Sequence, residues 1–327
     1  MEVKILLSTY NGERFLKEFL ESLSNQTYKD WALVVRDDGS RDSTLKIVEE
    51  FASSYFYRGK VSLLRDDGGT LGPCRSFLTL LQRAKGDYFF FADQDDVWLP
   101  NKIEKLLSRM IELEERYGRK TPMILHSDAV VVDQNLREIA TSLWLYERLD
   151  PNRKTLNYIL VQNNITGCCM VVNRALKTLL KEIPHRAVMH DWWLGLVASA
   201  LGLIEYYPER LVLYRQHSGQ NTGAKGYRVS VLLRRAFDWK GLIHSLERSL
   251  WQAREFLRIY GPYLSNEQHK LLHTFINLPK ESFYSKLALV SKYRFYKSGL
   301  LKNLGFMVVL LLLREVADGS ECLHCSV

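Results

Sequence analysis

The chain has 327 residues, of which 46% are hydrophobic and 25% charged, an ordinary composition for a globular protein. Only 8 Pro and 19 Gly residues are present, which excludes collagen-like and low-complexity sequences. At roughly 100–200 residues per domain, this length predicts about two domains. The five Cys residues, two of them adjacent at 168–169, lack the spacing of a disulfide framework and favour a reducing, cytosolic setting.

The positive charge is confined to the last third of the chain. Residues 1–220 contain 29 basic and 29 acidic residues, whereas residues 221–327 contain 16 and 8. This asymmetry predicts a polyanionic partner, either membrane head groups or nucleic acid, with a merely solvated helix face as the alternative. No signal-peptide pattern is expected at the N-terminus, where Met1-Glu2-Val3-Lys4 runs straight into an apolar segment.

The first 130 residues alternate between short apolar runs and amphipathic segments. Strands are predicted at Val3–Thr9, Trp31–Arg36, Val61–Leu64, Asp87–Ala92 and Ile124–His126. Helices are predicted between them, around residues 15–23, 45–51, 77–84 and 100–117. Such alternation is typical of a mostly parallel sheet covered by helices on both faces.

The rest of the chain changes from mixed to helical. Strands are predicted at Cys168–Asn173 and Leu211–Tyr214, and a helix at Asp191–Leu201. From residue 227 helices dominate, at Val229–Trp239, Leu242–Tyr260, Asn266–Phe275, Phe283–Tyr296 and Leu300–Val316. The last contains the longest apolar run, Phe306–Leu313, which spans about 12 Å as a helix and cannot cross a hydrocarbon core of ~30 Å. It is expected to pack in the core or to lie in a membrane interface.

Polar clusters follow three of the predicted strands. They are Ser8-Thr9-Tyr10-Asn11-Gly12, Asp37-Asp38-Gly39-Ser40 and Asp93-Gln94-Asp95-Asp96. The carboxyl ends of parallel strands meet at one edge of a sheet, where ligands bind, although any one cluster could be a turn or a helix cap. Three carboxylates within four residues repel one another unless a cation lies among them, and Mg²⁺ or Mn²⁺ is the natural partner. Because no P-loop or G-x-G-x-x-G pattern is present, a nucleotide diphosphate held through a metal ion is favoured.

Several motifs together resemble a known family. They are S-T-Y-N-G at 8–12, D-D-G-S at 37–40 and F-A-D-Q-D-D-V-W-L-P-N-K at 91–102. Over residues 1–220 the chain resembles family 2 glycosyltransferases of the GT-A fold. T-G-C at 166–168, H-D-W-W at 190–193 and Y-R-Q-H at 214–217 resemble the rhamnosyltransferases that build bacterial surface polysaccharides. The resemblance implies an α/β, Rossmann-like, mostly parallel sheet flanked by helices, followed by a helical C-terminal region.

The resemblance also implies roles for individual residues on the donor side. Five positions match nucleotide-sugar contacts of the family: Ser8, Tyr10, Asp38, Asp93 and Asp95. Asp93 and Asp95 form the family's D-x-D pair, which together with His217 would hold Mg²⁺ or Mn²⁺. The implied organisation is a nucleotide-sugar-binding half at 1–127, an acceptor-binding half at 128–220 and a basic helical region at 221–327.

On the acceptor side, Asp191 matches the catalytic base of the family, and a helix N-cap is its alternative role. Its neighbours His190, Trp192 and Trp193 are expected to contact the acceptor, although consecutive residues of a helix point apart and one Trp is expected in the core. Glycosyl transfer needs a cation to stabilise the leaving diphosphate and a base to take the proton of the acceptor hydroxyl.

The predicted function is an inverting, metal-dependent transfer of L-rhamnose from dTDP-rhamnose to a cell-surface polysaccharide or a lipid-linked oligosaccharide. The alternatives are a UDP-hexose or UDP-N-acetylhexosamine donor, a sugar-nucleotide pyrophosphorylase, whose phosphate loop is missing, and a basic nucleic-acid-binding protein. The predicted location is the cytoplasmic face of the membrane, where four cations near the apolar run would contact anionic lipid: Lys292, Arg294, Lys297 and Lys302.

Overall fold

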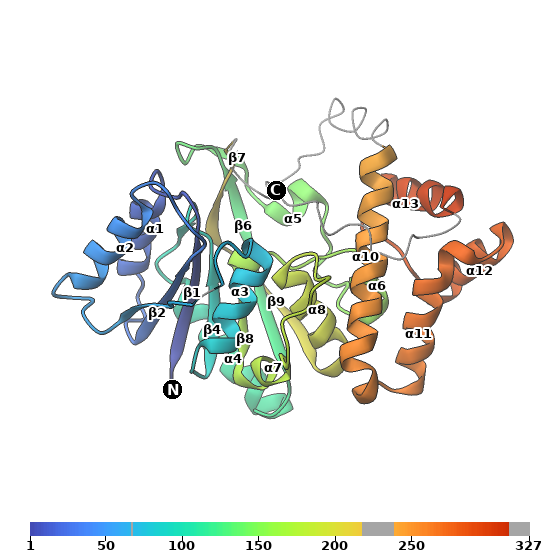
Figure 1. Ribbon diagram of the computed structural model, residues 1–327, viewed down its shortest axis with the longest axis horizontal. Helices are drawn as coiled ribbons and strands as arrows, with labels where there is room; N and C mark the ends of the chain where they lie inside the picture. Colours follow the sequence, from blue (N-terminus) through green and yellow to red (C-terminus); the bar gives the residue numbers. More distant parts are fainter. Residues whose placement is uncertain (67, 218–238, 314–327) are drawn as a thin grey trace.

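The computed structural model describes residues 1–66, 68–217 and 239–313. The predicted helix Val229–Trp239 lies outside the described residues except for Trp239. The predicted helix Leu300–Val316 is described only as far as residue 313. Within the described residues the fold is the expected one, an α/β sheet flanked by helices with further helices at its C-terminal side (Figure 1).

A single mixed sheet organises residues 3–215 in the order β3-β2-β1-β4-β8-β6-β9-β5, and β7 pairs with β6 at its end. The strands are β1 (Val3–Thr9), β2 (Trp31–Asp37), β3 (Val61–Leu63), β4 (Tyr88–Ala92), β5 (Val97–Trp98), β6 (Met123–Val132), β7 (Glu138–Ala140), β8 (Met170–Asn173) and β9 (Leu203–Arg215). The first four are parallel along the order β3-β2-β1-β4, and β6 and β9 are parallel to each other. β8 runs antiparallel between β4 and β6, so the sheet is mostly but not wholly parallel.

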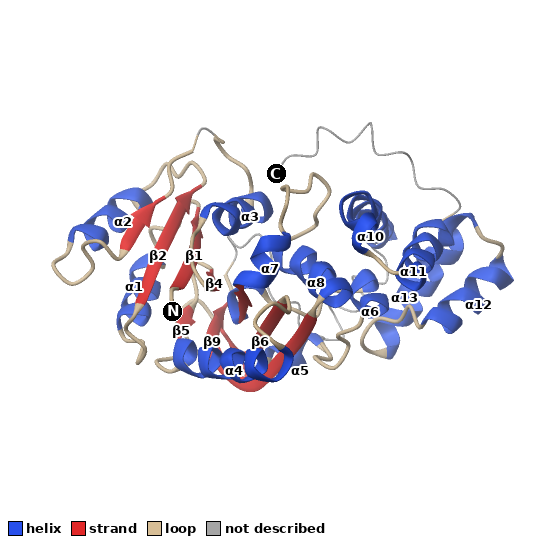
Figure 2. Ribbon diagram, turned by 90° about the horizontal axis from the view of Figure 1, so that it is seen from below, coloured by secondary structure: helices blue, strands red, loops and turns tan. Residues whose placement is uncertain are grey.

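Helices cover both faces of this sheet (Figure 2). One face packs against α1 (Leu16–Ser24), α2 (Thr44–Ser53), α4 (Lys102–Tyr117) and the short α5 (Leu143–Glu147). The other packs against α3 (Pro73–Arg83), α6 (Leu156–Val161), α7 (Arg174–Leu179) and α8 (His190–Leu201).

The sequence of β4 shows how one strand serves both layers. Successive side chains of a strand point to opposite faces. Tyr88 and Phe90 therefore join the core under α1 and α4, whereas Phe89 and Phe91 join the core under α3 and α8. A strand buried on both sides needs a continuous apolar run rather than an alternating one, which explains the Tyr-Phe-Phe-Phe segment.

The C-terminal helices extend the second core instead of forming a detached tail. They are α10 (Trp239–Tyr260), α11 (Asn266–Asn277), α12 (Phe283–Tyr293) and α13 (Leu300–Leu312). Trp193 of α8 contacts the rings of Phe256 and Tyr260 of α10, and Phe306 and Leu310 of α13 belong to the same core. Every helix in the described parts of the chain is too short or too polar to span a bilayer.

Candidate active site

The polar clusters predicted at three strand ends do meet at one edge of the sheet. Thr9 at the end of β1 lies beside Asp37 at the end of β2, and Leu7 lies beside Ala92 at the end of β4. The loop at 93–96 therefore begins level with the other two clusters. The side chain of Gln94 fixes this arrangement, because its amide donates to the Tyr10 carbonyl and accepts from the Tyr10 N–H, both at 2.9 Å.

Gly12 makes this close approach possible. A Cβ atom at position 12 would lie 2.1 Å from Oε1 of Gln94, far inside van der Waals contact. The S-T-Y-N-G motif therefore needs its glycine because the first loop packs directly against the Asp93-Gln94-Asp95-Asp96 loop.

The fold brings together Asp95 and His217, two side chains of types that can bind a metal ion. Oδ2 of Asp95 and Nε2 of His217 are 2.8 Å apart, although the two residues are 122 positions apart in the chain. The ring of Phe15 lies 4.8 Å from the His217 ring and limits its position. Of these two groups, the carboxylate oxygen is the donor that suits Mn²⁺ or Mg²⁺.

A buried arginine holds these two loops together. Arg215 of β9 is 1% exposed and donates to the carbonyls of Asp95 and Gln134 and to the carboxylate of Glu18. Its backbone N–H donates to Oδ1 of Asp96 at 3.0 Å. Arg215 lies two residues before His217. The contacts of Arg215 that fix the acidic loop therefore also restrict the position of His217.

Behind Asp95 lies a cluster of buried acidic groups. Ligand atoms of Asp93, Asp96 and Cys168 all lie within 4.8 Å of one another. Burial, followed by the negative charges of Asp95 and Asp191, raises the pKa of Asp93 to about 7. Burial also raises the pKa of Asp96 well above its usual value. A bound cation would favour the charged forms of these carboxylates, which is the arrangement predicted for the acidic loop.

Lys102 lies beneath this cluster and is fully buried. Its ammonium donates to the Cys168 carbonyl and lies 3.3 Å from the centre of the Trp98 ring. Burial lowers its pKa to about 8, and the nearby carboxylates oppose that effect. Lys102 thus offsets part of the negative charge from the side away from solvent.

Asp191 lies in the first turn of α8, 8% exposed. The N-cap of this helix is Met189, so the alternative role of Asp191 as the helix cap is wrong. Its Oδ2 accepts from the Gly167 N–H at 3.0 Å, and its Oδ1 from the Trp192 N–H at 2.6 Å. Burial raises its pKa to about 6, while these hydrogen bonds act in the opposite direction. The carboxylate is therefore oriented and poised to accept a proton near neutral pH.

Two of the three residues predicted to contact the acceptor lie in the interior of the structure. Trp193 has no exposed surface and packs in the core against α10. His190 is 4% exposed and lies between the rings of Phe77 and Phe91, and burial lowers its pKa to about 3. Trp192 is half-buried and donates from its indole N–H to the Ile159 carbonyl, so it alone keeps a partly accessible ring.

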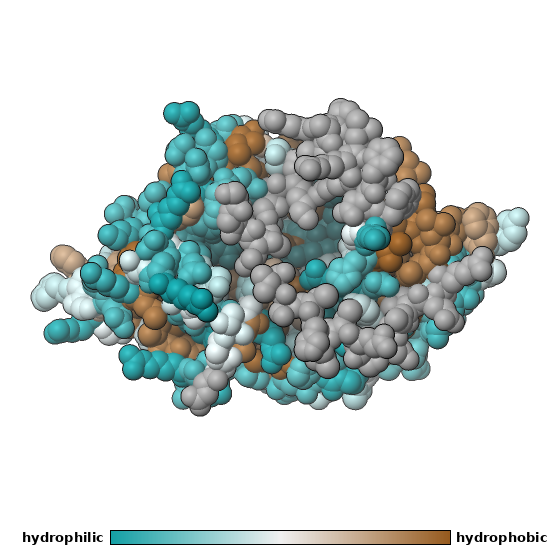
Figure 3. Space-filling model, turned by 45° about the horizontal axis from the view of Figure 1, so that its top comes forward, coloured by the Kyte–Doolittle hydropathy of each residue, from teal (hydrophilic) through white to brown (hydrophobic). Residues whose placement is uncertain are grey.

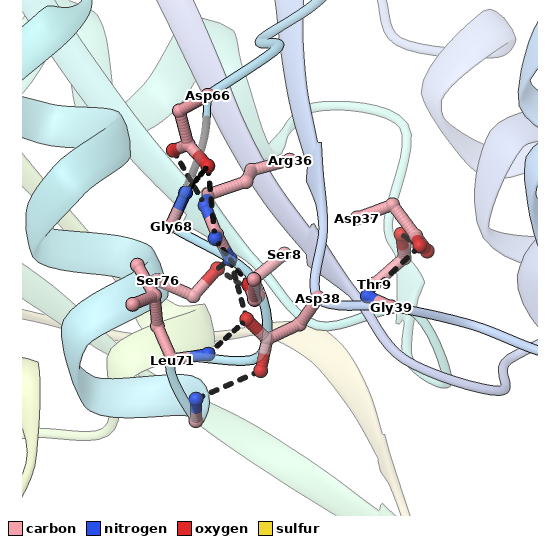
Figure 4. A network of polar contacts seen from close by, with 12 residues as sticks. Ser8, Thr9, Arg36, Asp37, Asp38, Gly39, Asp66, Gly68, Leu71 and Ser76 are labelled. Carbon is pink, nitrogen blue, oxygen red and sulfur yellow. Dashed lines mark hydrogen bonds and ion pairs between the residues drawn. The ribbon is translucent and has the colours of Figure 1, made fainter.

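Asp38, predicted to contact the donor, has partners within the protein itself. This residue is 4% exposed, and its oxygens accept from the Arg36 guanidinium and from the N–H groups of Leu71 and Gly72, at 2.7 and 2.8 Å for the two amides (Figure 4). Asp38 is thus an internal anchor of the loop that precedes α3.

Arg36 completes this anchor and was not anticipated from the sequence. It is 1% exposed and also donates to the Asp66 carboxylate and the Gly69 carbonyl (Figure 4). The Ser8 hydroxyl, another predicted donor contact, donates to Ser76 at 2.7 Å within the same network. Tyr10 differs from both, since its side chain is 48% exposed at the edge of the site.

Comparison with solved structures first identifies the class of fold. The chain superposes on TarS of S. aureus, solved with UDP-GlcNAc, with a TM-score of 0.54 and 16% identity over 96% of this chain and 90% of that one. It superposes on the mannosyltransferase PcManGT of Pyrobaculum calidifontis, solved with GDP-Man and Mn²⁺, with a TM-score of 0.52 and 14% identity over 96% and 86%. These likenesses establish the GT-A fold.

Sequence comparison then identifies the family. The profile of Glycosyl transferase family 2 matches residues 4–180, which is more than half of the chain, and the chain belongs to this family. The glycosyltransferase RP339 of Rickettsia prowazekii is 26% identical over 67% of this chain, and the match spans 65% of that protein. The dTDP-rhamnosyl transferase RfbG of Shigella flexneri is 25% identical over 77% of this chain and 83% of its own length.

Proposed function

We propose that this protein is an inverting, metal-dependent glycosyltransferase that moves L-rhamnose from dTDP-rhamnose to a saccharide or lipid-linked acceptor. The observation that carries the proposal is the convergence of Asp95 and His217 at the sheet edge. Asp93 lies behind them, and the negative charge of Asp191 is near enough to contribute to the raised pKa of Asp93. The named activity of RfbG supports the donor, and the Mn²⁺ complex of PcManGT supports the metal.

Asp95 and His217 would hold the divalent ion, with Asp93 as a further oxygen donor. The ion, when bound, neutralises the negative charge that gathers on the leaving diphosphate. Arg215 and Gln94 keep the loop that carries Asp93 and Asp95 in place, through hydrogen bonds to the Asp95 carbonyl and to the Tyr10 backbone. Little reorganisation of the loop is then needed when the diphosphate departs.

Asp191 would act as the general base. Its carboxylate takes the proton of the acceptor hydroxyl while the hydroxyl oxygen forms a bond to the anomeric carbon. The bond from that carbon to the diphosphate oxygen breaks on the opposite side, and its electron pair leaves with the nucleotide. Attack from the opposite side inverts the anomeric centre, so a β-L-rhamnosyl donor gives an α-L-linkage.

The donor is tested by incubating the full chain with Mn²⁺ and one of four nucleotide sugars: dTDP-rhamnose, UDP-glucose, UDP-GlcNAc or GDP-mannose. Slow hydrolysis that releases the nucleotide is expected fastest with dTDP-rhamnose and is expected to stop with excess EDTA. Faster release from a UDP-sugar would replace rhamnose by the alternative donor. If no donor is bound or hydrolysed, the proposed transfer is wrong.

The location is part of the same proposal. A lipid-linked acceptor lies in a membrane, and we place the protein at the cytoplasmic face, in contact with anionic lipid. The excess of basic residues after position 221 supports this placement, since an anionic surface attracts each nearby Lys or Arg by about 1 kcal/mol. The contribution of the four predicted cations needs revision, because Lys297 and Lys302 are tied to the protein itself.

A further inference from the structure

The outward face of α13 is apolar along its whole length. Lys302 is the only charged residue of this helix, and it donates to the Glu147 carbonyl at the C-terminal end of α5. Five of its apolar side chains are exposed: Leu300 at 74%, Leu301 at 47%, Leu304 at 54%, Val308 at 39% and Leu312 at 63%. At about 100° per residue they fall within one arc of roughly 120° of the helix circumference. We call these five residues the leucine stripe.

The opposite face of α13 already has its partner. Phe306, Val309 and Leu310 are almost fully buried in the core shared with α10 and α12. A helix that is apolar on all sides is normally buried on all sides. The leucine stripe is therefore an apolar surface whose exposure to water is unfavourable. Packing within the described residues does not explain why it is apolar.

The neighbouring helix enlarges this surface. α12 contacts α13, and its own exposed residues include Phe283 at 53%, Tyr284 at 81% and Leu287 at 39%. Figure 3 shows the apolar surface on the right of the molecule, on the same face as the polar recess near the centre. In Figure 1, α13 lies in the upper part of the molecule, the side toward which β1 runs from the N-terminus.

The segment that forms α12 and α13 carries charge of one sign. Residues 282–313 contain five Lys or Arg residues and no Asp or Glu. Lys292 and Arg294, at the end of α12, are exposed. Lys286, Lys297 and Lys302 instead face the protein, since Lys286 and Lys302 donate to backbone carbonyls and burial lowers the pKa of Lys297 to about 8. Lys292 and Arg294 are thus the two Lys or Arg residues of this segment that are exposed.

From these features we propose that the leucine stripe and the exposed face of α12 rest on an anionic lipid surface. The proposal rests on the proposed function, which places the acceptor at a membrane, and it names the surface that makes the contact. Two copies joined through this segment would add positive charge to positive charge, whereas anionic head groups attract both Lys292 and Arg294. With 13 residues, α13 is about 20 Å long and lies along the interface rather than across it.

Vesicle flotation of the full chain, without nucleotide sugar, tests the contact. The wild-type protein is expected to float with phosphatidylglycerol vesicles but not with phosphatidylcholine vesicles, and to be released by salt. The double substitution Leu304→Asn with Val308→Asn is expected to lower the bound fraction about tenfold or more, because it removes apolar area from the interface. Lys292→Gln with Arg294→Gln is expected to raise the phosphatidylglycerol content needed for binding.

The matched control is Tyr55→Asn with Phe56→Asn, which removes two apolar side chains that are 92% and 77% exposed outside the stripe. This variant should bind vesicles like the wild type. Equal recovery in the unbound fraction with both lipids, or unchanged binding of the Leu304/Val308 variant, would overturn the proposal. So would a dimer in light scattering that this variant abolishes, because the stripe would then be covered by a second copy.

Donor hydrolysis in the absence of vesicles separates the two proposals. The Leu304/Val308 variant is expected to hydrolyse the donor at the wild-type rate, which also shows that it is folded. If the wild-type protein binds vesicles but turns over no donor, the membrane contact stands and the proposed transfer fails. If it turns over donor but binds no vesicles, only the membrane contact fails.

Discussion

Single residues decide the chemistry of the site, and Asp191 shows how. Its carboxylate is buried at the start of α8, which raises its pKa to about 6, and two backbone N–H groups fix its direction. A carboxylate with this pKa is ionised at neutral pH and is a stronger base than an exposed one. The sequence predicted the position by resemblance, but it did not show the burial that raises the pKa or the Gly167 N–H, 24 residues earlier, that orients the carboxylate and partly opposes this rise.

The first prediction concerns the proton transfer by Asp191. Below a pH of about 6 the carboxylate becomes protonated, so kcat/KM of the wild type should fall as the pH drops through that value. Asp191→Asn should lower kcat by at least ~100-fold and leave donor affinity near normal. Initial rates measured across a range of pH test both effects. Substitution of the exposed Asp30 by Asn is the control. A variant with nearly wild-type kcat would assign the base elsewhere.

The second prediction concerns Asp95 and His217. If both hold one ion, Asp95→Asn and His217→Gln should each weaken Mn²⁺-dependent binding of the nucleotide diphosphate by about tenfold or more. The double variant should lose much less than the sum of the two free-energy changes, because the ion is already lost in either single variant. Calorimetric titrations of the nucleotide diphosphate, in the presence of Mn²⁺ or of EDTA, give the affinities of the four proteins in this double-mutant cycle. Additive losses, or full activity in EDTA, would contradict a shared ion.

The placement of residues was predictable where motif and local position suffice, and not where burial decides. The sequence places Asp93, Asp95 and His217, and the structure brings Asp95 and His217 to 2.8 Å. It does not distinguish Trp192 from Trp193, because only the packing of α10 shows which ring lies in the core. For the same reason Arg215, hidden within the Y-R-Q-H motif, was not recognised as the residue that holds the acidic loop.

At the scale of elements, apolar runs predicted the central strands closely. β1 has the predicted bounds, and β2 and β4 differ from the prediction by one residue each. β9 is longer than predicted, extending over Leu203–Arg215, because its first half shows no regular alternation of polar and apolar residues and contains Pro208, which disfavours a strand prediction. The short β5, β7, α5, α6 and α7 were missed, since two to six residues carry too little periodicity for a prediction.

The loop before α3 is the element whose role changed most, and the third prediction tests it. Asp38→Asn keeps the shape of the side chain but removes the negative charge beside the buried Arg36 guanidinium. The expected loss is about 3 kcal/mol in the free energy of unfolding, because a buried charge loses one of its partners. Urea unfolding measures it, with Glu49→Gln on the exposed side of α2 as control. The loop at 65–72 should also loosen and raise KM for the donor more than it lowers kcat. Unchanged stability would mean that Asp66 alone suffices for Arg36.

At the scale of the whole molecule, the C-terminal helices and the sheet share one core. The core beneath α3 and α8 continues without interruption through α10, α11 and α13. The charge and composition of the chain indicated a separate basic region, because composition reports the exposed residues and says little about which faces pack. The inner faces of these helices belong to the core, and some of the basic side chains, such as Lys286 and Lys302, donate to backbone carbonyls instead of facing solvent.

The fourth prediction follows from this shared core. Phe256→Ala should lower the free energy of unfolding by about 3–5 kcal/mol, because the side chain is fully buried against Trp193 and Tyr260. Near-ultraviolet and far-ultraviolet circular dichroism should report the same single transition in wild type and variant. Phe56→Ala, at a side chain 77% exposed, should change stability by less than about 0.5 kcal/mol. A separate early transition of the helical region would contradict one cooperative unit.

Lys286 of α12 has a consequence for orientation. Its buried ammonium donates to the carbonyls of Leu310 and Leu313 at the end of α13, at 2.9 and 2.8 Å. Lifting α13 away would strand a charge inside the protein, which is costly enough to keep the two helices together. We therefore expect α13, the last helix among the described residues, to keep a fixed orientation relative to α12. The body of the protein therefore sets the orientation of the sheet edge relative to any surface that α13 contacts. It also sets the distance from that surface at which Asp191 can accept the proton of an acceptor hydroxyl.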